Sequence, residues 1–275
     1  MKSTMIEDSM RTADNGNQIA VPAVERALNI LEYLGEKGAP ATLKEISSTL
    51  GIPAASTFRI VRYLCSRGYI EEDANIQGRY ELGLQLLRLA HLLDRRLDLR
   101  TIAVYPMRRL AEESGQTAQL GILQGYGVMY IDQAEPREPV SIIAALRTIL
   151  PVNVSAAGKV LVAYLPPKEQ EEFLERAELR AQTPKSITDK ASFKAELERV
   201  REMGFAIDDE EYARGIGCLA VPIFDHTGTN VAAVGITGHI IDYRDKDRLG
   251  CLIQLVQEAA GEISAKMGYA GEVRA

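Results

Sequence analysis

Apolar positions recur at helical spacing near the front of the chain, over residues 43–50. Thr42 precedes them and Glu45 follows three residues later, which is the capping-box pattern that marks the start of a helix. Gly51 then permits a sharp turn, and a second helix is predicted over about 54–67. Two short helices joined by a tight turn are typical of a helix-turn-helix.

The second helix has two chemically different faces. Its inward face is predicted to hold Thr57, Ile60, Val61 and Leu64, and its outward face Ala54, Ala55, Ser56, Arg59 and Arg62. Small residues at the front let a helix enter a groove deeply, and arginines further along reach phosphates or guanine edges. From Gly51 to Ile70 there is no Asp or Glu, in a chain whose net charge is -6. This local exclusion of acidic residues favours DNA binding.

A predicted hairpin follows the second helix directly. Residues 69–73 and 79–82 form two short strands, and a hairpin in this place makes a winged helix, with Arg79 placed to touch the DNA backbone or minor groove. Two helices with a glycine turn also occur in plain helical bundles, where three arginines would form a solvated face, but the hairpin favours the DNA-binding interpretation. The candidate DNA-contacting residues are Ala55, Ser56, Arg59, Arg62 and Arg79, together with Thr57, although its side chain is expected to turn inward.

After residue 83 the pattern first predicts helices and then a mixture of strands and helices. Helices are predicted over 84–96, 99–114, 156–165, 168–178, 189–203 and 245–267, and strands over 117–124, 128–134, 140–145, 205–208, 217–224 and 231–237. The fold class is therefore α+β, with an antiparallel sheet and helices on one side of it. The expected organisation is a disordered leader (1–20), a winged helix-turn-helix domain (21–83), a linker helix that also pairs subunits (84–98) and an α+β domain (99–270).

Composition restricts the partners and the compartment. Residues 21–96 hold ten Lys and Arg against nine Asp and Glu, whereas residues 97–275 hold twenty against twenty-six. A more basic DNA-binding domain joined to a more acidic second domain suits site-specific DNA binding. The three cysteines form no CxxC pair, so neither a disulfide framework nor a zinc site is indicated, and no cofactor is expected. No apolar run approaches the roughly 18–20 residues of a membrane span, and no signal peptide is seen, so a cytoplasmic protein is expected.

Few residue patterns in the second half suggest catalysis. Gly158-Lys159 does not complete a phosphate-binding loop, because Val160 stands where Ser or Thr would bind Mg²⁺. Asp208-Asp209-Glu210-Glu211 is most simply a solvated strand end. Cys218 could be a nucleophile with His226 as its base, although nothing is placed to orient the pair. A ligand sensor is therefore favoured over an enzyme.

A binding pocket could form from a few of the same residues. Ala156-Ala157 at a helix start offers backbone N–H groups for an anion. Cys218 and Thr237 lie in adjacent predicted strands and could point into one cavity, where Asp208 could accept a hydrogen bond from a ligand hydroxyl.

Several motifs together resemble the IclR family of bacterial transcriptional regulators. They are Val21–Leu34, Gly51-Ile52-Pro53, Gly78–Leu84, Leu150-Pro151 with Ser155–Lys159, and Asp208–Glu211 through Gly215 and Gly217–Ile223. The resemblance implies a winged helix-turn-helix, a linker helix and a GAF-like α+β effector domain, whose pocket would use Ala156, Ala157, Asp208, Cys218, Gly235 and Thr237. Gly235 stands where the family often has serine, which would remove a donor and widen the cavity.

These observations lead to one functional prediction. The chain is expected to be a ligand-responsive DNA-binding regulator, a repressor of a catabolic operon, that acts as a homodimer or homotetramer on a double-stranded operator. Its effector is expected to be a small organic acid, because the helix start supplies donors for a carboxylate. The alternatives are an enzyme that depends on Cys218 and a DNA-binding scaffold without a ligand.

Overall fold

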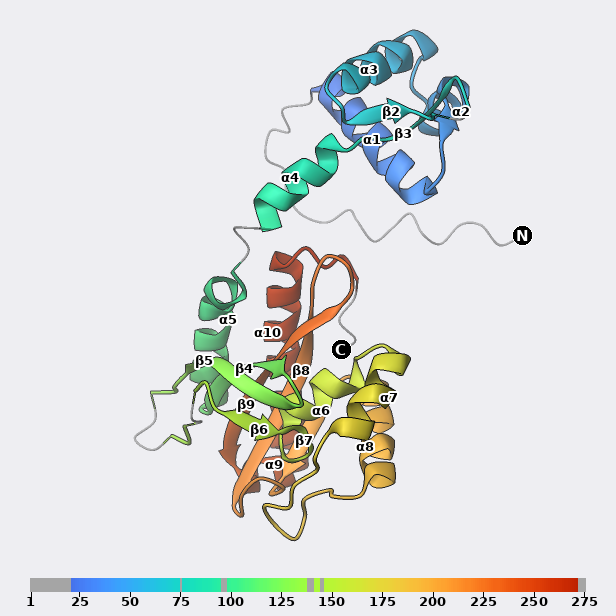
Figure 1. The fold of residues 1–275 in the computed structure, drawn as a ribbon. Coiled ribbons are helices and arrows are strands. Elements are labelled where there is room, and N and C mark those ends of the chain that lie inside the picture. Colours follow the sequence, from blue (N-terminus) through green and yellow to red (C-terminus); the bar gives the residue numbers. More distant parts are fainter. Residues whose placement is uncertain (1–20, 75, 95–97, 138–140, 144–145, 272–275) are drawn as a thin grey trace, which may run out of the picture. The chain divides into compact units, whose positions relative to one another are not determined.

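The computed structural model describes residues 21–74, 76–94, 98–137, 141–143 and 146–271. The chain forms two compact units, Met1–Arg96 and Leu97–Ala275, which we describe separately (Figure 1). The predicted leader, residues 1–20, lies outside the described residues. None of the helices in the described part is long and apolar enough to cross a membrane.

The first unit is a winged helix-turn-helix, as predicted. Its elements are α1 (Pro22–Lys37), β1 (Ala41–Thr42), α2 (Leu43–Leu50), α3 (Ala54–Ser66), β2 (Ile70–Glu72), β3 (Arg79–Leu82) and α4 (Gln85–Asp94). The strands form a small antiparallel sheet in the order β1-β3-β2. The two-residue strand β1 was not predicted, because so short a segment carries no periodicity.

Local chemistry sets the turn between α2 and α3. The Thr42 N–H donates to Glu45 Oε2 at 2.6 Å and the Glu45 N–H donates to Thr42 Oγ1 at 3.2 Å, which completes the predicted capping box. Gly51 ends α2 with a φ of 63°, a left-handed conformation that glycine adopts at little cost. The helices then pack around a small core that includes Ile30, Ile46, Val61, Leu64 and Ile70.

The second unit is built on a six-stranded antiparallel sheet. Its strands are β4 (Thr117–Gln124), β5 (Gly127–Ala134), β6 (Ile149–Pro151), β7 (Ala206–Asp209), β8 (Ile216–Phe224) and β9 (Asn230–His239), in the spatial order β6-β5-β4-β9-β8-β7. Its helices are α5 (Leu99–Ser114), the short 3-10 helix Val152–Val154, α6 (Ala156–Ala163), α7 (Pro167–Arg176), α8 (Lys190–Met203), α9 (Ile240–Arg244) and α10 (Lys246–Lys266).

Helices cover both faces of this sheet, and the prediction of helices on one side is wrong. Leu219 and Val221 of β8 pack in a core with α5 and α10, whereas Ala220 between them packs in a second core with α6, α7 and α8. Side chains alternate between the faces of a strand, so β8 is buried on both sides.

The third predicted strand is also misplaced. Residues 141–143 are not in a strand, while 140, 144 and 145 lie outside the described residues. The edge position beside β5 is taken by β6 instead.

Candidate DNA interface and effector cavity

The outward face of α3 carries most of the predicted DNA-contacting residues. Ala55, Arg59 and Arg62 are exposed and Ser56 is half-buried. Thr57 is fully buried, and its hydroxyl lies 3.3 Å from the Ile52 carbonyl oxygen and 3.4 Å from that of Pro53. Its inclusion among the DNA-contacting residues is therefore wrong, because its hydroxyl closes the turn between α2 and α3.

Two aromatic residues on the same helix were missed. Phe58 is 51% exposed and Tyr63 is 61% exposed. The Arg67 guanidinium donates a hydrogen bond of 3.0 Å to the Tyr63 hydroxyl. The sequence pattern gave these residues no role, because an aromatic residue in a helix is more often part of a core.

Arg79 holds the wing to the body of the first unit. Its Nη1 donates to the Pro40 carbonyl oxygen at 2.9 Å and lies 3.9 Å from Glu45 Oε2. This side chain is therefore engaged within the unit, and its contact with DNA stays a prediction.

A small cavity lies in the second unit at one end of α6. It measures about 50 Å³, and it is lined by Gln119, Tyr130, Ile142, Ile143, Leu150, Val154, Ser155, Asp208, Tyr212, Ile216, Cys218 and Thr237. Three of the six predicted effector-binding residues are in this set: Asp208, Cys218 and Thr237.

The other three predicted residues are packed beside the cavity, not in its lining. Ala156 and Ala157 are 1% and 3% exposed and belong to the core around α6. A Cβ on Gly235 would lie only 2.3 Å from the Leu219 carbonyl oxygen. Gly235 therefore allows β8 and β9 to approach closely, and the expectation that it widens the cavity is wrong.

Hydroxyl and amide groups line part of the cavity wall. The Thr237 hydroxyl lies 2.9 Å from Gln119 Oε1 and 3.3 Å from Cys218 Sγ. The Tyr130 hydroxyl lies 3.0 Å from Ser155 Oγ, which in turn accepts the Gly158 N–H as the N-cap of α6. Burial raises the pKa of the Tyr130 hydroxyl, which therefore stays protonated.

Asp208 is the charged residue of this wall. Its side chain is 1% exposed, and Oδ1 accepts the N–H of Glu211 at 2.6 Å and that of Tyr212 at 3.4 Å. Oδ2 is buried and has no hydrogen-bond partner among the described residues. Burial raises the pKa of this carboxyl, and the two backbone donors, the nearby Lys159 and the Cys218 thiol offset only part of that effect.

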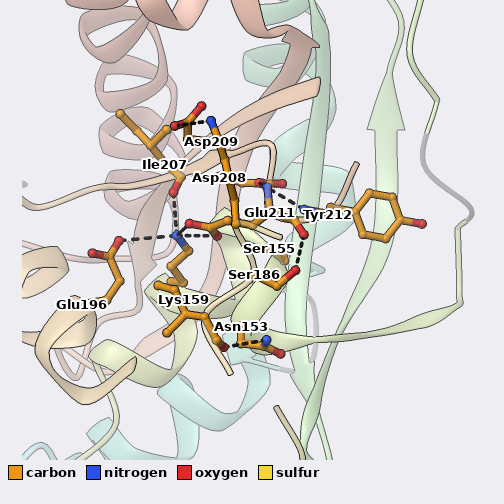
Figure 2. Close-up of polar contacts among 12 residues, drawn as sticks. Asn153, Ser155, Lys159, Ser186, Glu196, Ile207, Asp208, Asp209, Glu211 and Tyr212 are labelled. Carbon is orange, nitrogen blue, oxygen red and sulfur yellow. Dashed lines mark hydrogen bonds and ion pairs between the residues drawn. The ribbon is translucent and has the colours of Figure 1, made fainter. Parts of the chain in front are cut away.

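Lys159 occupies the centre of a buried cluster next to Asp208 (Figure 2). Its side chain is fully buried, and Nζ donates to the Ile207 carbonyl oxygen at 2.7 Å. Nζ also lies 2.7 Å from both carboxylate oxygens of Glu211 and 3.4 Å from Glu196 Oε1. The lysine thus ties α6 to β7, to the turn after β7 and to α8.

Lys159 attracts the carboxyl groups of both Glu211 and Asp208. Burial raises the pKa of Glu211 to about 7, because desolvation outweighs the attraction of Lys159. Glu196, by contrast, is also held by the guanidinium of Arg199, whose Nε lies 2.9 Å from Glu196 Oε2. Residues 208 and 211 are buried, so the prediction of a solvated strand end is wrong for both of them.

The proposed nucleophile and base do not meet. Cys218 lies near the start of β8 and His226 lies in the turn beyond its end, so the extended strand from Cys218 to Phe224, roughly 20 Å long, stands between them. Burial also raises the pKa of the Cys218 thiol well above its ordinary value. Among the described residues, no group of three or more His, Cys, Asp or Glu side chains could hold a metal ion.

Comparison with known proteins relates both units to one family. A model of the bacterial transcriptional regulator IclR C-terminal domain matches residues 91–265, and a model of the IclR helix-turn-helix domain matches residues 23–74. The chain is 31% identical over 251 residues to the HTH-type transcriptional repressor AllR of Escherichia coli K12, covering 91% of this chain and 92% of AllR. It is 30% identical over 249 residues to the regulator XynR of the same strain, covering 90% and 98%.

Solved structures agree with this assignment. The IclR protein of Thermotoga maritima is 30% identical and superposes with a TM-score of 0.60, covering 90% of this chain and 98% of that one. An IclR transcriptional regulator from Silicibacter is 25% identical with a TM-score of 0.76, covering 91% and 97%. The relatives are transcriptional regulators and not enzymes, so the chain belongs to the IclR family of helix-turn-helix transcriptional regulators, with a C-terminal effector-binding domain.

Proposed function

We propose that this chain is a cytoplasmic, ligand-responsive repressor of a catabolic operon, in which α3 reads the operator and the cavity of the second unit binds a small organic acid. On the DNA side, the support is the exposed, acid-free face of α3 with Arg59 and Arg62. The similarity to AllR, a repressor, supports repression and not activation.

The unpartnered Oδ2 of Asp208 carries the ligand proposal. A buried carboxylate oxygen without a donor costs free energy, so a ligand hydroxyl that donates to it would be favoured. Ser155 lines the cavity and starts α6, and the amide N–H groups of Ala156 and Ala157, whose side chains are packed beside the cavity, lack an intrahelical acceptor and suit the carboxylate of the same ligand. The Thr237 hydroxyl supplies a further polar contact.

The size of the cavity restricts the ligand further. About 50 Å³ holds on the order of a few water molecules, so we propose a short-chain hydroxy or oxo acid. Ile142 and Ile143 form part of the apolar wall, and a larger acid would require this segment to shift. An IclR homolog of Microbacterium hydrocarbonoxydans has been crystallised with 4-hydroxybenzoate, which combines a hydroxyl and a carboxylate on one ring.

We also propose that two copies pair through the first unit. Val24 and Leu28 on α1, and Leu84 and Leu87 beside and on α4, are each more than half exposed. The remainder of the predicted pairing segment, residues 95–97, lies outside the described residues. A two-fold dimer would present two α3 helices to successive major grooves, and an effector could shift its arrangement by about 1–3 kcal/mol of coupling.

Titration calorimetry tests the ligand proposal. Short-chain 2-hydroxy and 2-oxo acids are titrated into the full-length protein beside their neutral carboxamides, which keep the size and the hydroxyl or oxo group but lose the charge. We expect the acids to bind and the carboxamides to bind at least tenfold more weakly, and Asp208→Asn to weaken the hydroxy acids. Equal binding of acid and carboxamide would contradict the proposal.

A gel-shift salt titration tests the DNA-reading helix. We expect Arg59→Ala to lower affinity for a duplex selected from random sequence and to reduce the salt slope by about one phosphate contact, or to relax base preference if Arg59 reads guanine. Arg137→Ala in the second unit, where the side chain is exposed, is the matched control and should leave the slope unchanged. An unaltered titration for Arg59→Ala would remove this residue from the interface.

A further inference from the structure

A large apolar side chain stands on the face of α3 that we assign to DNA. All five phenylalanines of the chain are described, and Phe58 is the exposed one, whereas Phe173 and Phe193 are 7% and 0% exposed. Leaving a phenylalanine in water forgoes roughly the 1.5–3 kcal/mol that its burial would contribute. Phe58 is therefore suited to a partner that covers it.

The surroundings of Phe58 indicate which partner this is. Ala54 lies four residues before it and Arg62 four residues after it, so the three side chains form one ridge of the helix, and all three are exposed. Ala54 and Ala55 present no bulk at the front of α3, which allows Phe58 on the next turn to approach base edges. With arginines beside it and no acidic residue from Gly51 to Ile70, this ridge fits duplex DNA better than an apolar protein surface.

The chemistry of the side chain restricts what it can read. A phenyl ring neither donates nor accepts a conventional hydrogen bond, and the apolar group that B-DNA presents in the major groove is the C5 methyl of thymine. Tyr63, the other exposed aromatic residue of α3, lies further along the helix and is hydrogen-bonded to Arg67, as suits a residue near the DNA backbone.

We propose that Phe58 is a specificity-determining residue that contacts the C5 methyl group of a thymine in each half-site of the operator. The proposal rests on the proposed function, in which α3 enters the major groove. It adds a base preference that the arginines of the same face cannot supply, since guanidinium groups pair with guanine edges or phosphates.

Removal of single methyl groups tests the contact. The full-length protein is first used to select duplexes from a random pool. Each thymine of the best duplex is then replaced by deoxyuridine, which lacks only the C5 methyl, and affinities are compared by competition. We expect each half-site to contain one thymine at which deoxyuridine weakens wild-type binding about three- to fivefold, the effect of losing the contact with one methyl group. Phe58→Ala should bind the thymine and deoxyuridine duplexes equally.

Two further variants keep the result interpretable. Phe58→Leu retains an apolar contact and should keep part of the discrimination, while Tyr63→Ala should keep all of it; circular dichroism verifies that each variant is folded. A selected motif with no position sensitive to deoxyuridine, or unchanged discrimination by Phe58→Ala, would overturn the proposal. A changed oligomeric state in Phe58→Ala with the same deoxyuridine profile would overturn it in favour of a protein contact. Failure of the wild-type protein to enrich any motif would instead overturn the proposed function and this inference with it.

Discussion

Replacing the buried lysine of α6 tests the electrostatics of the second unit most directly. Lys159→Met keeps the length and apolar stem of the side chain and removes its charge. The Ile207 carbonyl oxygen and the Glu211 carboxylate then lose the donor that lies 2.7 Å from each. Removing one partner of a buried ion pair typically costs about 3–5 kcal/mol, because the other charge stays buried and unpaired. We expect the second unit to lose stability by that order.

The loss should depend on pH, with a sign that follows from Glu211. Its folded-state pKa of about 7 lies above the ordinary value of 4.5 for a glutamate, so its contribution to stability is full below about 4.5 and is lost as pH rises through about 7. Lys159 lowers this pKa, so its removal raises it further. The deficit of Lys159→Met should therefore grow with pH, by about 1.4 kcal/mol for each unit by which the pKa rises.

The loss of stability is measured by urea unfolding, followed by hydrogen exchange and mass spectrometry. Reading the exchange on peptides of α6 reports on the second unit separately from the first. Wild type and Lys159→Met are compared at about pH 5.5 and about pH 8. Lys168→Met, at an exposed position of α7, is the control and should stay within about 0.5 kcal/mol. Adding Glu211→Gln to Lys159→Met should recover part of the loss. An equal deficit at both pH values, together with no recovery, would refute the electrostatic explanation and leave packing alone.

Two further predictions concern the same domain. Cys218 should resist iodoacetamide at neutral pH while exposed Cys251 reacts, because burial raises the pKa of the Cys218 thiol; mass spectrometry that finds Cys218 labelled first would contradict this. Gly158→Ala should destabilise the second unit by about 1–3 kcal/mol in urea, because the added Cβ would lie 2.6 Å from the Val152 Cα, whereas Gly261→Ala, with open space, should be neutral or stabilising.

The first unit could be predicted from the sequence because its signals are local. The capping box at Thr42 and Glu45 and the left-handed Gly51 act within a few residues, and the structure has both. Arg79 was harder to interpret, since its partner at Pro40 lies 39 residues away and no local pattern reports such a contact.

In the second unit, the residues of β8 themselves indicate burial on both faces. Residues 217–224 form a nearly continuous apolar run, which is typical of a strand covered on both sides, whereas one-sided cover would give alternation. The buried charged cluster around Lys159 was harder to predict from the sequence. Lys159 and Glu211 are 52 residues apart, and charged residues are normally solvated, so only the tertiary packing of α6 against β7 brings them inside.

The charge balance of this cluster links the ligand proposal to the structure. Lys159 faces two buried carboxylates, Asp208 and Glu211, so full ionisation would leave one excess negative charge beside the cavity. A bound carboxylate would add another and would raise the pKa of Asp208 and Glu211 further, which favours uptake of a proton. Protonated Asp208 is a hydrogen-bond donor as well as an acceptor, so it could satisfy either a hydroxyl or an oxo group. The same cavity therefore accommodates hydroxy and oxo acids, and affinity for either should increase as pH falls.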